Sequence, residues 1–309
     1  MDYFLDKPNL IKISLTNLCN FRCVMCYYPE LKQEKGFISD ELLSKILEEC
    51  EKLGINRVSL GGVGEPLLHK NYVKYLHAAK SLGFWVSTTT NCSLLNKEIA
   101  EAIIREKLDR INLSIYSSDP LEHRAYTGTD TFGQVVENVK YLIKLWQSSN
   151  RDTLIKFKFL KIPGINDYEK FKEFWQPLIK NTGFEISVKD PVNWGSRVNF
   201  QNNKLFFGYR RRRLCKQIRY LFYILHNGDV LPCCCITEGA GYGEVVFGNM
   251  ENDTIIKIWQ SDKYLAFKNN HYRGKLSAYR PCRNCSEVFS ELNFLHWVKK
   301  CLHIKLAVL

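Results

Sequence analysis

The fold is decided by residues 10–26, LIKISLTNLCNFRCVMC, in which an apolar run leads directly into three cysteines. The run, Leu10–Thr16, is rich in β-branched and apolar residues, which is typical of a buried strand. Cys19, Cys23 and Cys26 follow at the spacing CxxxCxxC within one loop. Three thiolates leave one iron of a cubane [4Fe–4S] cluster without a protein ligand, and a small molecule can chelate that iron through an amino group and a carboxylate. The sequence therefore predicts a metal centre at the end of the first strand.

Apolar runs and helical stretches alternate through the first 190 residues. The other runs that we expect to be strands are Arg57–Leu60, Trp85–Thr89, Arg110–Tyr116, Leu154–Leu160 and Glu185–Lys189. The stretches with helical periodicity are Ser39–Leu53, Asn71–Leu82, Lys97–Glu106, Phe132–Trp146 and Tyr168–Lys180. Six β/α units in series predict an α/β fold, a partial (β/α)6 TIM-like barrel with a parallel sheet, over residues 1–190. Such barrels place their active sites at the carboxyl ends of the strands, where the three cysteines fall.

The β/α pattern ends after residue 190. Residues 191–214 contain Pro, Gly and several Asn, which predicts a linker, and its basic end, Arg210–Arg213, is expected to be a solvated loop. Residues 215–309 are predicted to form a small cysteine-rich domain, in which Tyr220–Pro232 is a hairpin that turns at Asn227–Gly228. The cysteines that cluster there are Cys215, Cys233, Cys234, Cys235, Cys282 and Cys285.

A glycine-rich turn, Gly61–Pro66, follows the second expected strand. Glycines let the backbone come close to a ligand, and Glu65 offers an acceptor for a cationic amino group. Alone, such a turn is weak evidence, but its place at a strand end beside the cysteine loop favours a binding role. Further along the chain, Asp130 or Thr131 is expected to cap the helix that begins at Phe132.

The composition favours a reduced compartment and an anionic partner. The chain has 309 residues, a formal net charge of +12 and twelve cysteines. This charge suits a phosphorylated metabolite, an acidic peptide, nucleic acid or a membrane surface. Its apolar stretches are far shorter than the roughly 20 residues of a membrane span, and its N-terminus lacks the layout of a secretory signal, so we expect a soluble, cytoplasmic protein. Because cytoplasmic thiols stay reduced, the clustered cysteines indicate metal ligation, while Cys50 and Cys92 are expected to be ordinary buried thiols.

The cysteine loop and the glycine-rich turn together resemble the radical S-adenosylmethionine (SAM) superfamily, whose signature is CxxxCxΦC with Φ usually aromatic. Met25 stands at Φ, a departure that a large, soft side chain tolerates. The resemblance implies that Cys19, Cys23 and Cys26 hold a [4Fe–4S] cluster that cleaves SAM to a 5′-deoxyadenosyl radical. The residues that it assigns to SAM are Tyr27 at the adenine, Gly61, Gly62, Gly64 and Glu65 at the amino group, and Asn91 and Ser114 at the carboxylate or ribose.

The second cysteine group resembles the auxiliary-cluster domain called SPASM, in its short form related to the twitch domain. The resemblance is carried by the order Cys215, Gly228–Cys233, Gly248–Asn249, Ile258–Trp259 and Cys282–Cys285. The full SPASM pattern has seven cysteines, and here only Cys301 follows the CxxC pair. The resemblance therefore implies one auxiliary [4Fe–4S] cluster, ligated by Cys215, Cys233, Cys282 and Cys285, with Cys234 as the alternative to Cys233.

Structural zinc is the alternative for both cysteine groups, because zinc is also held by clustered thiolates. At the first group, His69 or another distant residue would be the fourth ligand. The position of the three cysteines at a strand end, and the fit of the rest of the chain, favour the iron–sulfur interpretation.

The function that the resemblance implies is that of a radical SAM oxidoreductase, in which a substrate radical passes an electron to the auxiliary cluster. We expect an anionic small metabolite, a sugar- or aminocyclitol-like alcohol, and an electron donor such as flavodoxin or ferredoxin. The candidate substrate contacts are Lys158, Lys161, Lys189, Asn193 and Arg197.

Two alternatives stay open. One is a maturase or epimerase of a ribosomally synthesised peptide, with Cys234 or Cys235 as the hydrogen-atom donor. The other, from a different class, is a non-enzymatic iron–sulfur or zinc protein that binds nucleic acid through its basic surface, and the intact glycine-rich turn speaks against it.

Overall fold

A computed structural model describes residues 5–27, 31–162, 164–192, 194, 210–212, 215–235, 242–276, 278–283, 285 and 289–291. The strands are β1 Leu10–Ile13, β2 Arg57–Leu60, β3 Trp85–Thr90, β4 Arg110–Ser114, β5 Leu154–Leu160, β6 Glu185–Lys189, β7 Arg210–Arg212, β8 Leu221–Ile224, β9 Val230–Leu231 and β10 Phe289–Glu291. The helices of the first half are α1 Asp40–Lys52, the 3-10 helix η2 Pro66–Leu68, α2 Tyr72–Ser81, α3 Lys97–Arg105, α4 Pro120–Thr127, α5 Phe132–Gln147 and α6 Tyr168–Ile179. Those of the second half are α7 Gln217–Tyr220, α8 Tyr242–Val245, α9 Ile255–Trp259, α10 Asp262–Tyr272 and α11 Arg280–Arg283.

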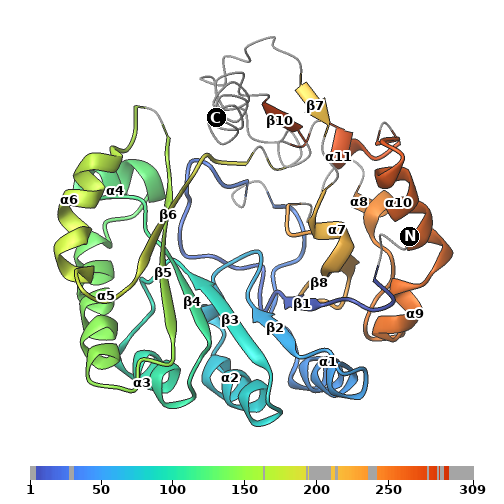
Figure 1. Cartoon of the computed structure of the whole chain (residues 1–309), viewed down its shortest axis with the longest axis horizontal. Coiled ribbons are helices and arrows are strands. Elements are labelled where there is room, and N and C mark those ends of the chain that lie inside the picture. Colours follow the sequence, from blue (N-terminus) through green and yellow to red (C-terminus); the bar gives the residue numbers. More distant parts are fainter. Residues whose placement is uncertain are drawn as a thin grey trace, which may run out of the picture.

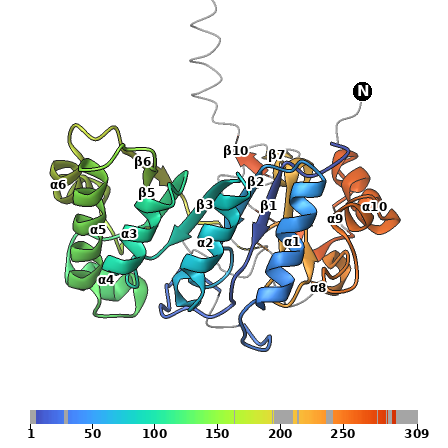
Figure 2. The same ribbon diagram turned by 90° about the horizontal axis from the view of Figure 1, so that it is seen from below.

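Eight strands form one curved sheet in the order β6-β5-β4-β3-β2-β1-β8-β9, which confirms the predicted α/β fold with a mostly parallel sheet. All neighbours are parallel except β8 and β9, which form an antiparallel hairpin. Helices α1, α2, α3 and α5 lie on the outer side of the curve, and the inner side faces the middle of the molecule (Figure 1). The view from below shows the same layer of helices in front of the strands (Figure 2).

Side chains alternate between the two faces of the sheet. The outward-pointing residues are fully buried against the helices, for example Ile11, Val58, Ile111 and Phe157. The inward-pointing residues are mostly polar, and Lys12, Ser59 and Ser87 lie side by side in register. The apolar core therefore lies between the sheet and the helices, and the inner face carries the polar side chains.

The predicted elements agree with the structure in order, and two predicted strands are too long. Strand β1 ends at Ile13 because Ser14 turns its hydroxyl to Val63 and Thr16 pairs with Phe37 instead. Strand β4 ends at Ser114. The five predicted helices all form, with ends that differ by at most one residue.

Helix α4 is absent from the sequence prediction. Its signals are local: Asp119 accepts a hydrogen bond from the Glu122 backbone, Pro120 occupies the first turn, and Gly128 ends the helix at φ 71°. A search for N-cap, proline and C-terminal glycine would have found it.

The N-cap residue of α5 is Thr131, one of the two that were predicted, but it makes no side-chain capping bond: its hydroxyl contacts His123 and Thr129, and Asp130 pairs with Arg124. One further prediction is corrected. The expected basic loop is in part a strand, because Arg210–Arg212 pairs with β10. The linker residues 193, 195–209, 213 and 214 lie outside the described part of the chain.

The hairpin predicted at Tyr220–Pro232 is confirmed, with Gly228 at φ 85° in its turn. Its first strand, β8, lies parallel to β1, with Leu10 opposite Leu221 and Lys12 opposite Tyr223. The C-terminal region thus extends the sheet of the first 190 residues. Among the described helices, none is both long enough and apolar enough to cross a membrane.

Candidate active site

The cysteine loop leaves β1 and is held by the last turn of α4. The backbone N–H groups of Arg22 and Val24 donate to the carbonyls of Thr127 and Tyr126, at 2.8 and 3.0 Å. The Cys26 N–H donates to the Cys23 carbonyl at 2.9 Å, which closes the loop into a tight turn. These hydrogen bonds therefore fix the backbone of the loop that carries all three cysteines.

The three thiols are half-buried and free of disulfides. Burial raises the pKa of Cys19 to about 12 and raises that of Cys23 well above its usual range, and the neighbouring cysteines add to both effects. Such thiols stay protonated at neutral pH unless a positive metal centre stabilises the thiolates. The donor set therefore fits an iron–sulfur cluster with one iron left open for SAM.

Aromatic and apolar side chains enclose the loop. Met25 packs with Tyr126 and Ile162, and the Tyr116 ring stacks on Tyr126 with centroids 4.6 Å apart. The hydroxyl of Tyr126 is buried without a hydrogen-bond partner among the described residues. Met25 thus fills the position of the usual aromatic residue by packing against two tyrosines.

Tyr27, at the end of the loop, is buried against Leu31 and Val63. The Trp194 ring lies 4.9 Å from the Tyr27 ring, and its Nε1 donates to the Met25 carbonyl at 2.7 Å. Sequence reasoning missed Trp194, since a single aromatic residue in an expected linker carries no local signal.

The glycine-rich turn lies beside the cysteine loop because both follow neighbouring strands. A Cβ on Gly64 would clash with the Leu18 carbonyl oxygen, so this residue allows the two loops to touch. A Cβ on Gly62 would clash with the Tyr223 hydroxyl and would lie 2.9 Å from Ser14 Oγ. The same two hydroxyls accept from the Val63 N–H at 2.9 and 3.0 Å. Tyr223 and Ser14, which the sequence analysis did not single out, therefore hold this turn.

The Glu65 carboxylate is buried and bonded within the protein. It accepts from the Thr90 hydroxyl and the Asn91 N–H, both at 2.7 Å, and from the Leu67 N–H at 3.2 Å. Burial raises its pKa to about 7, against the effect of these bonds. The carboxylate ties the ends of β2 and β3 together, and an additional contact with an amino group stays a prediction.

Asn91 joins the end of β3 to the cysteine loop. Its Nδ2 donates to Asn20 Oδ1 at 2.9 Å, and its Oδ1 accepts from the hydroxyl and the N–H of Ser93. Ser114 ends β4 on the inner face, in register with Lys158. Gly61, Gly62, Gly64, Glu65, Asn91 and Ser114 thus lie at the same edge of the sheet as the cysteine loop.

The second cysteine group lies around the hairpin and α11. Cys215, Cys233, Cys234 and Cys285 are half-buried, and Cys235 and Cys282 are buried. Cys215 and Cys233 lie close enough to Tyr264 to add to the rise that burial causes in its pKa. The Cys234 pKa is lowered, first by a hydrogen bond from Cys235 and then by Lys12 of β1. Cys234 therefore lies toward the inner face of the sheet.

The zinc alternative with His69 does not fit. His69 is buried, its Nε2 lies 3.1 Å from the Ile38 carbonyl, and its Nδ1 accepts from the Asn71 N–H at 3.1 Å. Within the described residues, no three His, Cys, Asp or Glu side chains lie close enough to hold a single metal ion. Cys50 and Cys92 are fully buried, as expected for structural thiols.

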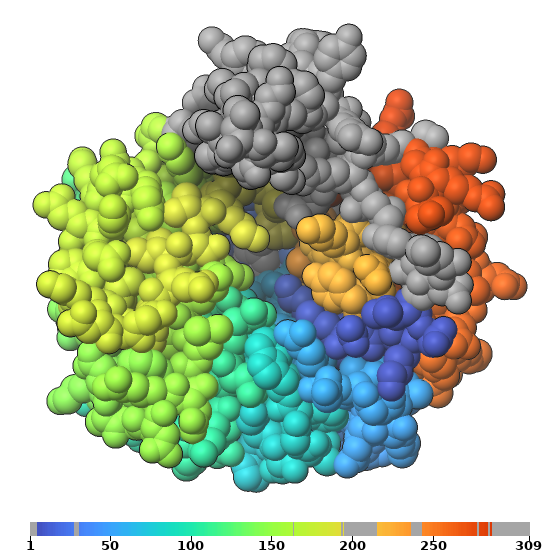
Figure 3. Space-filling view, viewed as in Figure 1, coloured from blue at the N-terminus to red at the C-terminus, as the bar shows by residue number. Residues whose placement is uncertain are grey.

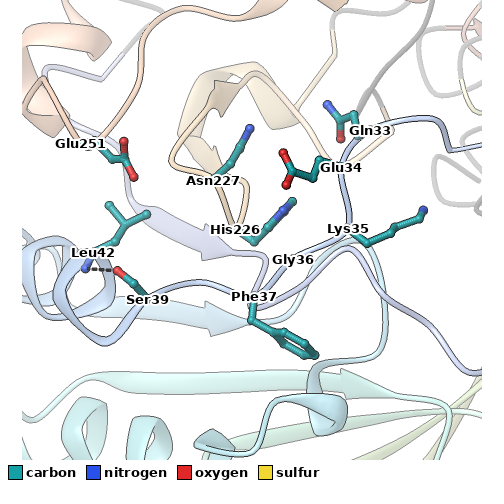
Figure 4. Close-up of a pocket in the computed structure, with 10 residues that line it drawn as sticks. All are labelled: Gln33, Glu34, Lys35, Gly36, Phe37, Ser39, Leu42, His226, Asn227 and Glu251. Carbon is teal, nitrogen blue, oxygen red and sulfur yellow. Dashed lines mark hydrogen bonds between the residues drawn. The ribbon is translucent and has the colours of Figure 1, made fainter.

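A separate pocket of about 340 Å³ lies where the segment before α1 meets the hairpin turn (Figure 4). Gly36, Phe37, His226 and Glu251 are among its lining residues. A Cβ on Gly36 would lie 3.0 Å from the His226 ring, so the glycine allows this contact. None of the residues predicted to bind SAM or a cluster is among its described lining.

Comparison with known families decides the identity of the site. The sequence model of the Radical SAM superfamily matches residues 13–174, and that of an iron–sulfur cluster-binding domain, SPASM, matches residues 215–286. The chain belongs to the radical SAM superfamily. It carries a SPASM domain, and these families imply SAM and [4Fe–4S] clusters as cofactors.

Curated relatives of this radical SAM protein have several different names. A probable GTP 3′,8-cyclase of Saccharolobus solfataricus is 32% identical over 51% of this chain and 54% of its own length. The chain thus spans about half the length of these relatives. A protein of Pyrococcus furiosus, named as modifying the cofactor of a tungsten-containing aldehyde ferredoxin oxidoreductase, is 22% identical over 89% of this chain and 86% of its own length.

Solved structures share the fold at low identity. BtrN in complex with AdoMet and 2-DOIA has a TM-score of 0.61 at 17% identity, covering 90% of this chain and 92% of its own. Streptococcus suis SuiB, bound to the precursor peptide SuiA, has a TM-score of 0.59 at 17% identity, covering 86% of this chain and 67% of its own.

Proposed function

We propose that this radical SAM enzyme oxidises an anionic small metabolite, a sugar- or aminocyclitol-like alcohol, inside the barrel. The observation that supports this is the pairing of β8 with β1, which sets Lys12 of the inner face opposite Tyr223, together with the effect of Lys12 in lowering the pKa of Cys234. A cluster held next to that face can accept an electron from a substrate radical formed there.

The proposal assigns each part of the chain a role. Cys19, Cys23 and Cys26 hold the first cluster, and Cys215, Cys233, Cys282 and Cys285 hold the second. The bound clusters and SAM supply the electron transfer and the hydrogen-abstracting radical. The glycine-rich turn with Tyr27, Asn91 and Ser114 orients SAM, and the packed side chains of Met25, Tyr126 and Trp194 exclude water from the loop.

The substrate class and surroundings belong to the same proposal. Lys158, which is half-buried, and Lys189, which is exposed, lie on the inner face as in-register partners of Ser114 and Leu160. Lys161 is exposed beyond the end of β5. Asn193 and Arg197 lie outside the described residues. The curated relatives named GTP 3′,8-cyclases are named after GTP, an anionic compound. Their name agrees with the anionic substrate that we propose for this chain. A cytoplasmic location and a flavodoxin or ferredoxin donor suit clusters that must be reduced.

The first test concerns the cluster. Replacing Cys19, Cys23 and Cys26 together by Ala should reduce the iron of anaerobically reconstituted protein from about eight to about four per chain. Release of 5′-deoxyadenosine from SAM should stop. Retained release would contradict the assignment of this loop.

A second candidate is a peptide epimerase, and the position of Cys234 near the inner face favours it. A thiol there can return a hydrogen atom to a substrate radical, and its hydrogen exchanges with solvent. SuiB, whose fold is similar, has been solved with a precursor peptide.

Turnover in deuterium oxide separates the two candidates. The oxidation that we propose gives a product that has lost two hydrogens and carries no solvent deuterium. The Cys234→Ala variant should then still convert substrate. An unoxidised product with one deuterium at the reacting carbon, lost together with turnover in Cys234→Ala, would establish the epimerase instead.

A further inference from the structure

The inner face of the sheet carries a row of cations at fixed positions. Because residues in register point to the same face, Lys12, Ser59, Ser87 and Arg110 form one line across β1 to β4. Lys158 follows on β5, between Ser114 and Ser187. Arg57 and Lys189 lie on the same face at the ends of β2 and β6. We call Lys12, Arg57, Arg110, Lys158 and Lys189 the inner cations.

Within the part of the chain that the structure describes, no carboxylate is paired with the inner cations. Of the described residues on this face, the one acidic side chain is Glu185, and it is paired with Lys156 at 2.6 Å. No carboxylate of the described chain forms an ion pair with Lys12, Arg110 or Lys158. Lys156 lies two residues before Lys158, on the same strand and face. Its charge is neutralised by Glu185, whereas no described carboxylate is paired with Lys158, so the two lysines can be compared directly.

The inner cations lie close enough to affect one another. The pKa of Lys158 is lowered to about 8, mainly by burial and then by Lys12 and Lys189, with a smaller effect of Arg110. Arg57 and Arg110 both lie over the Trp85 ring, at 4.5 and 4.9 Å from its centroid. Arg110 Nε is buried without a hydrogen-bond partner among the described residues. Placing cations close together without a negative charge costs folding free energy, and a bound anion would offset this cost.

The molecule is hollowed on the face that Figure 3 shows. Figure 3 shows a depression in the middle of the molecule, between the yellow part that holds β6 and the orange part that holds β8 and β9. The inner cations themselves stand on strands, which hold side chains at more constant positions than loops do.

We propose that the inner cations bind a phosphate group of the substrate, so that the metabolite is a phosphate ester. This inference rests on the proposed function and narrows its substrate class. Phosphate carries up to two negative charges and three acceptor oxygens, which suits arginine forks and lysine point charges that share one face of the sheet. The serines of the row, Ser59 and Ser87, offer further donors. SAM cannot be the counter-ion, since it carries two cationic groups and one carboxylate.

The competing role for these residues is to balance the negative charge of the auxiliary cluster. Lys12 lowers the pKa of Cys234, and Cys234 in turn raises that of Lys158, so both lysines interact electrostatically with this thiol. Lys12 is therefore a poor test position, whereas Arg110 is the better one because it lies beside Trp85 and Arg57.

The test is a calorimetric titration of the anaerobically reconstituted, full-length protein with inorganic phosphate at low ionic strength. The wild-type chain should bind phosphate at one site, and Lys158→Met and Arg110→Met should each bind it at least about ten-fold more weakly, as expected for a lost charge-assisted contact. Lys156→Met is the matched control and should stay within about two-fold of wild type, because Glu185 already neutralises that lysine. Glutarate, a dicarboxylate, should bind at least about ten-fold more weakly than phosphate.

Three results would overturn the proposal. Equal affinity in wild type, Lys158→Met and Arg110→Met would show that phosphate binds elsewhere, and an equal loss in Lys156→Met would show unspecific attraction. Loss of about four irons in the two test variants would establish the charge-balancing role. Release of 5′-deoxyadenosine from SAM by the wild-type chain without phosphate tests the proposed function separately, so that the two failures are distinct.

Discussion

At the scale of single residues, the conformation of the glycine-rich turn depends on a hydroxyl group from the C-terminal region. The Tyr223 hydroxyl accepts from the Val63 N–H at 2.9 Å and donates to Ser14 Oγ at 3.3 Å. Tyr223 belongs to β8, so the C-terminal region takes part in shaping the turn that we propose for SAM. Gly62 is the residue that makes room for this contact.

We predict that Gly62→Ala displaces Tyr223 and weakens both stability and SAM binding. The added Cβ would lie well inside contact distance of the Tyr223 ring and hydroxyl, and forced repacking of this kind costs about 1–3 kcal/mol. Thermal unfolding and equilibrium dialysis with SAM measure the two effects.

Gly133→Ala is the matched control for that experiment. Gly133 lies in the first turn of α5, and a Cβ there meets no atom within 4 Å. Its replacement should leave SAM binding unchanged and the melting temperature equal or slightly higher. If Gly62→Ala behaved like Gly133→Ala, the proposed role of Tyr223 in holding the glycine-rich turn would be wrong.

At the scale of elements, α4 links the cysteine loop to the rest of the barrel. Its last carbonyls accept from Arg22 and Val24. Within the helix, His123 lies between two hydroxyls, with Nδ1 3.1 Å from Ser117 and Nε2 3.1 Å from Thr131. Burial lowers the pKa of His123 from 6.5 to about 4.

This buried histidine predicts a loss of stability in acid. The folded pKa lies below the unfolded one, so the stabilisation is present above about pH 6.5 and is lost as the pH falls toward about 4. The shift corresponds to roughly 3 kcal/mol. We expect the melting temperature of wild type to fall between about pH 7 and pH 5 more steeply than that of His123→Gln, which keeps hydrogen-bonding groups without the titration.

Acid effects on the clusters are common to both proteins, so the difference between the two slopes is the measured quantity. Parallel slopes would mean that His123 is protonated in the folded chain at little cost.

At the scale of the whole molecule, the two family domains share one sheet. Strand β8 lies between β1 and β9, and its side chains Phe222, Tyr223 and Ile224 are fully buried. Without β8, β1 would be an open edge, and Ile11 and Ile13 would lose part of their cover.

We therefore predict that residues 1–214 alone do not form a stable barrel. Burial of one large apolar side chain contributes about 1.5–3 kcal/mol, and the loss of several approaches the whole stability of a typical domain, about 5–15 kcal/mol. Circular dichroism and thermal unfolding of the fragment should show no cooperative transition.

The full-length Cys282→Ala, Cys285→Ala variant is the comparison for the fragment. It should lose about four irons but keep a cooperative transition and uncoupled SAM cleavage, because β8 is intact. A fragment that unfolds as cooperatively as this variant would show that the barrel does not need the hairpin.

The sequence alone determined the order of the elements and the identity of the cysteine loop. Period-two runs such as Leu154–Leu160 and helical stretches such as Ser39–Leu53 are local patterns, and local patterns suffice to place strands and helices. The spacing of Cys19, Cys23 and Cys26 is equally local, and so is the glycine-rich turn. Helix α4 was also encoded locally, by Asp119, Pro120 and Gly128, and was missed only because those signals were not read together.

Only the tertiary structure decided which distant residues meet. The pairing of β8 with β1, the hydroxyl of Tyr223 at Val63 and the inner cations all depend on strand register, which joins residues up to about two hundred positions apart. The contact of the Trp194 ring with Tyr27 likewise joins distant residues. Register is set by burial of one face against the helices, a property of the assembled sheet. The sequence names the residues that carry charge, but the curve of the sheet brings Lys12, Arg110 and Lys158 to one side of it.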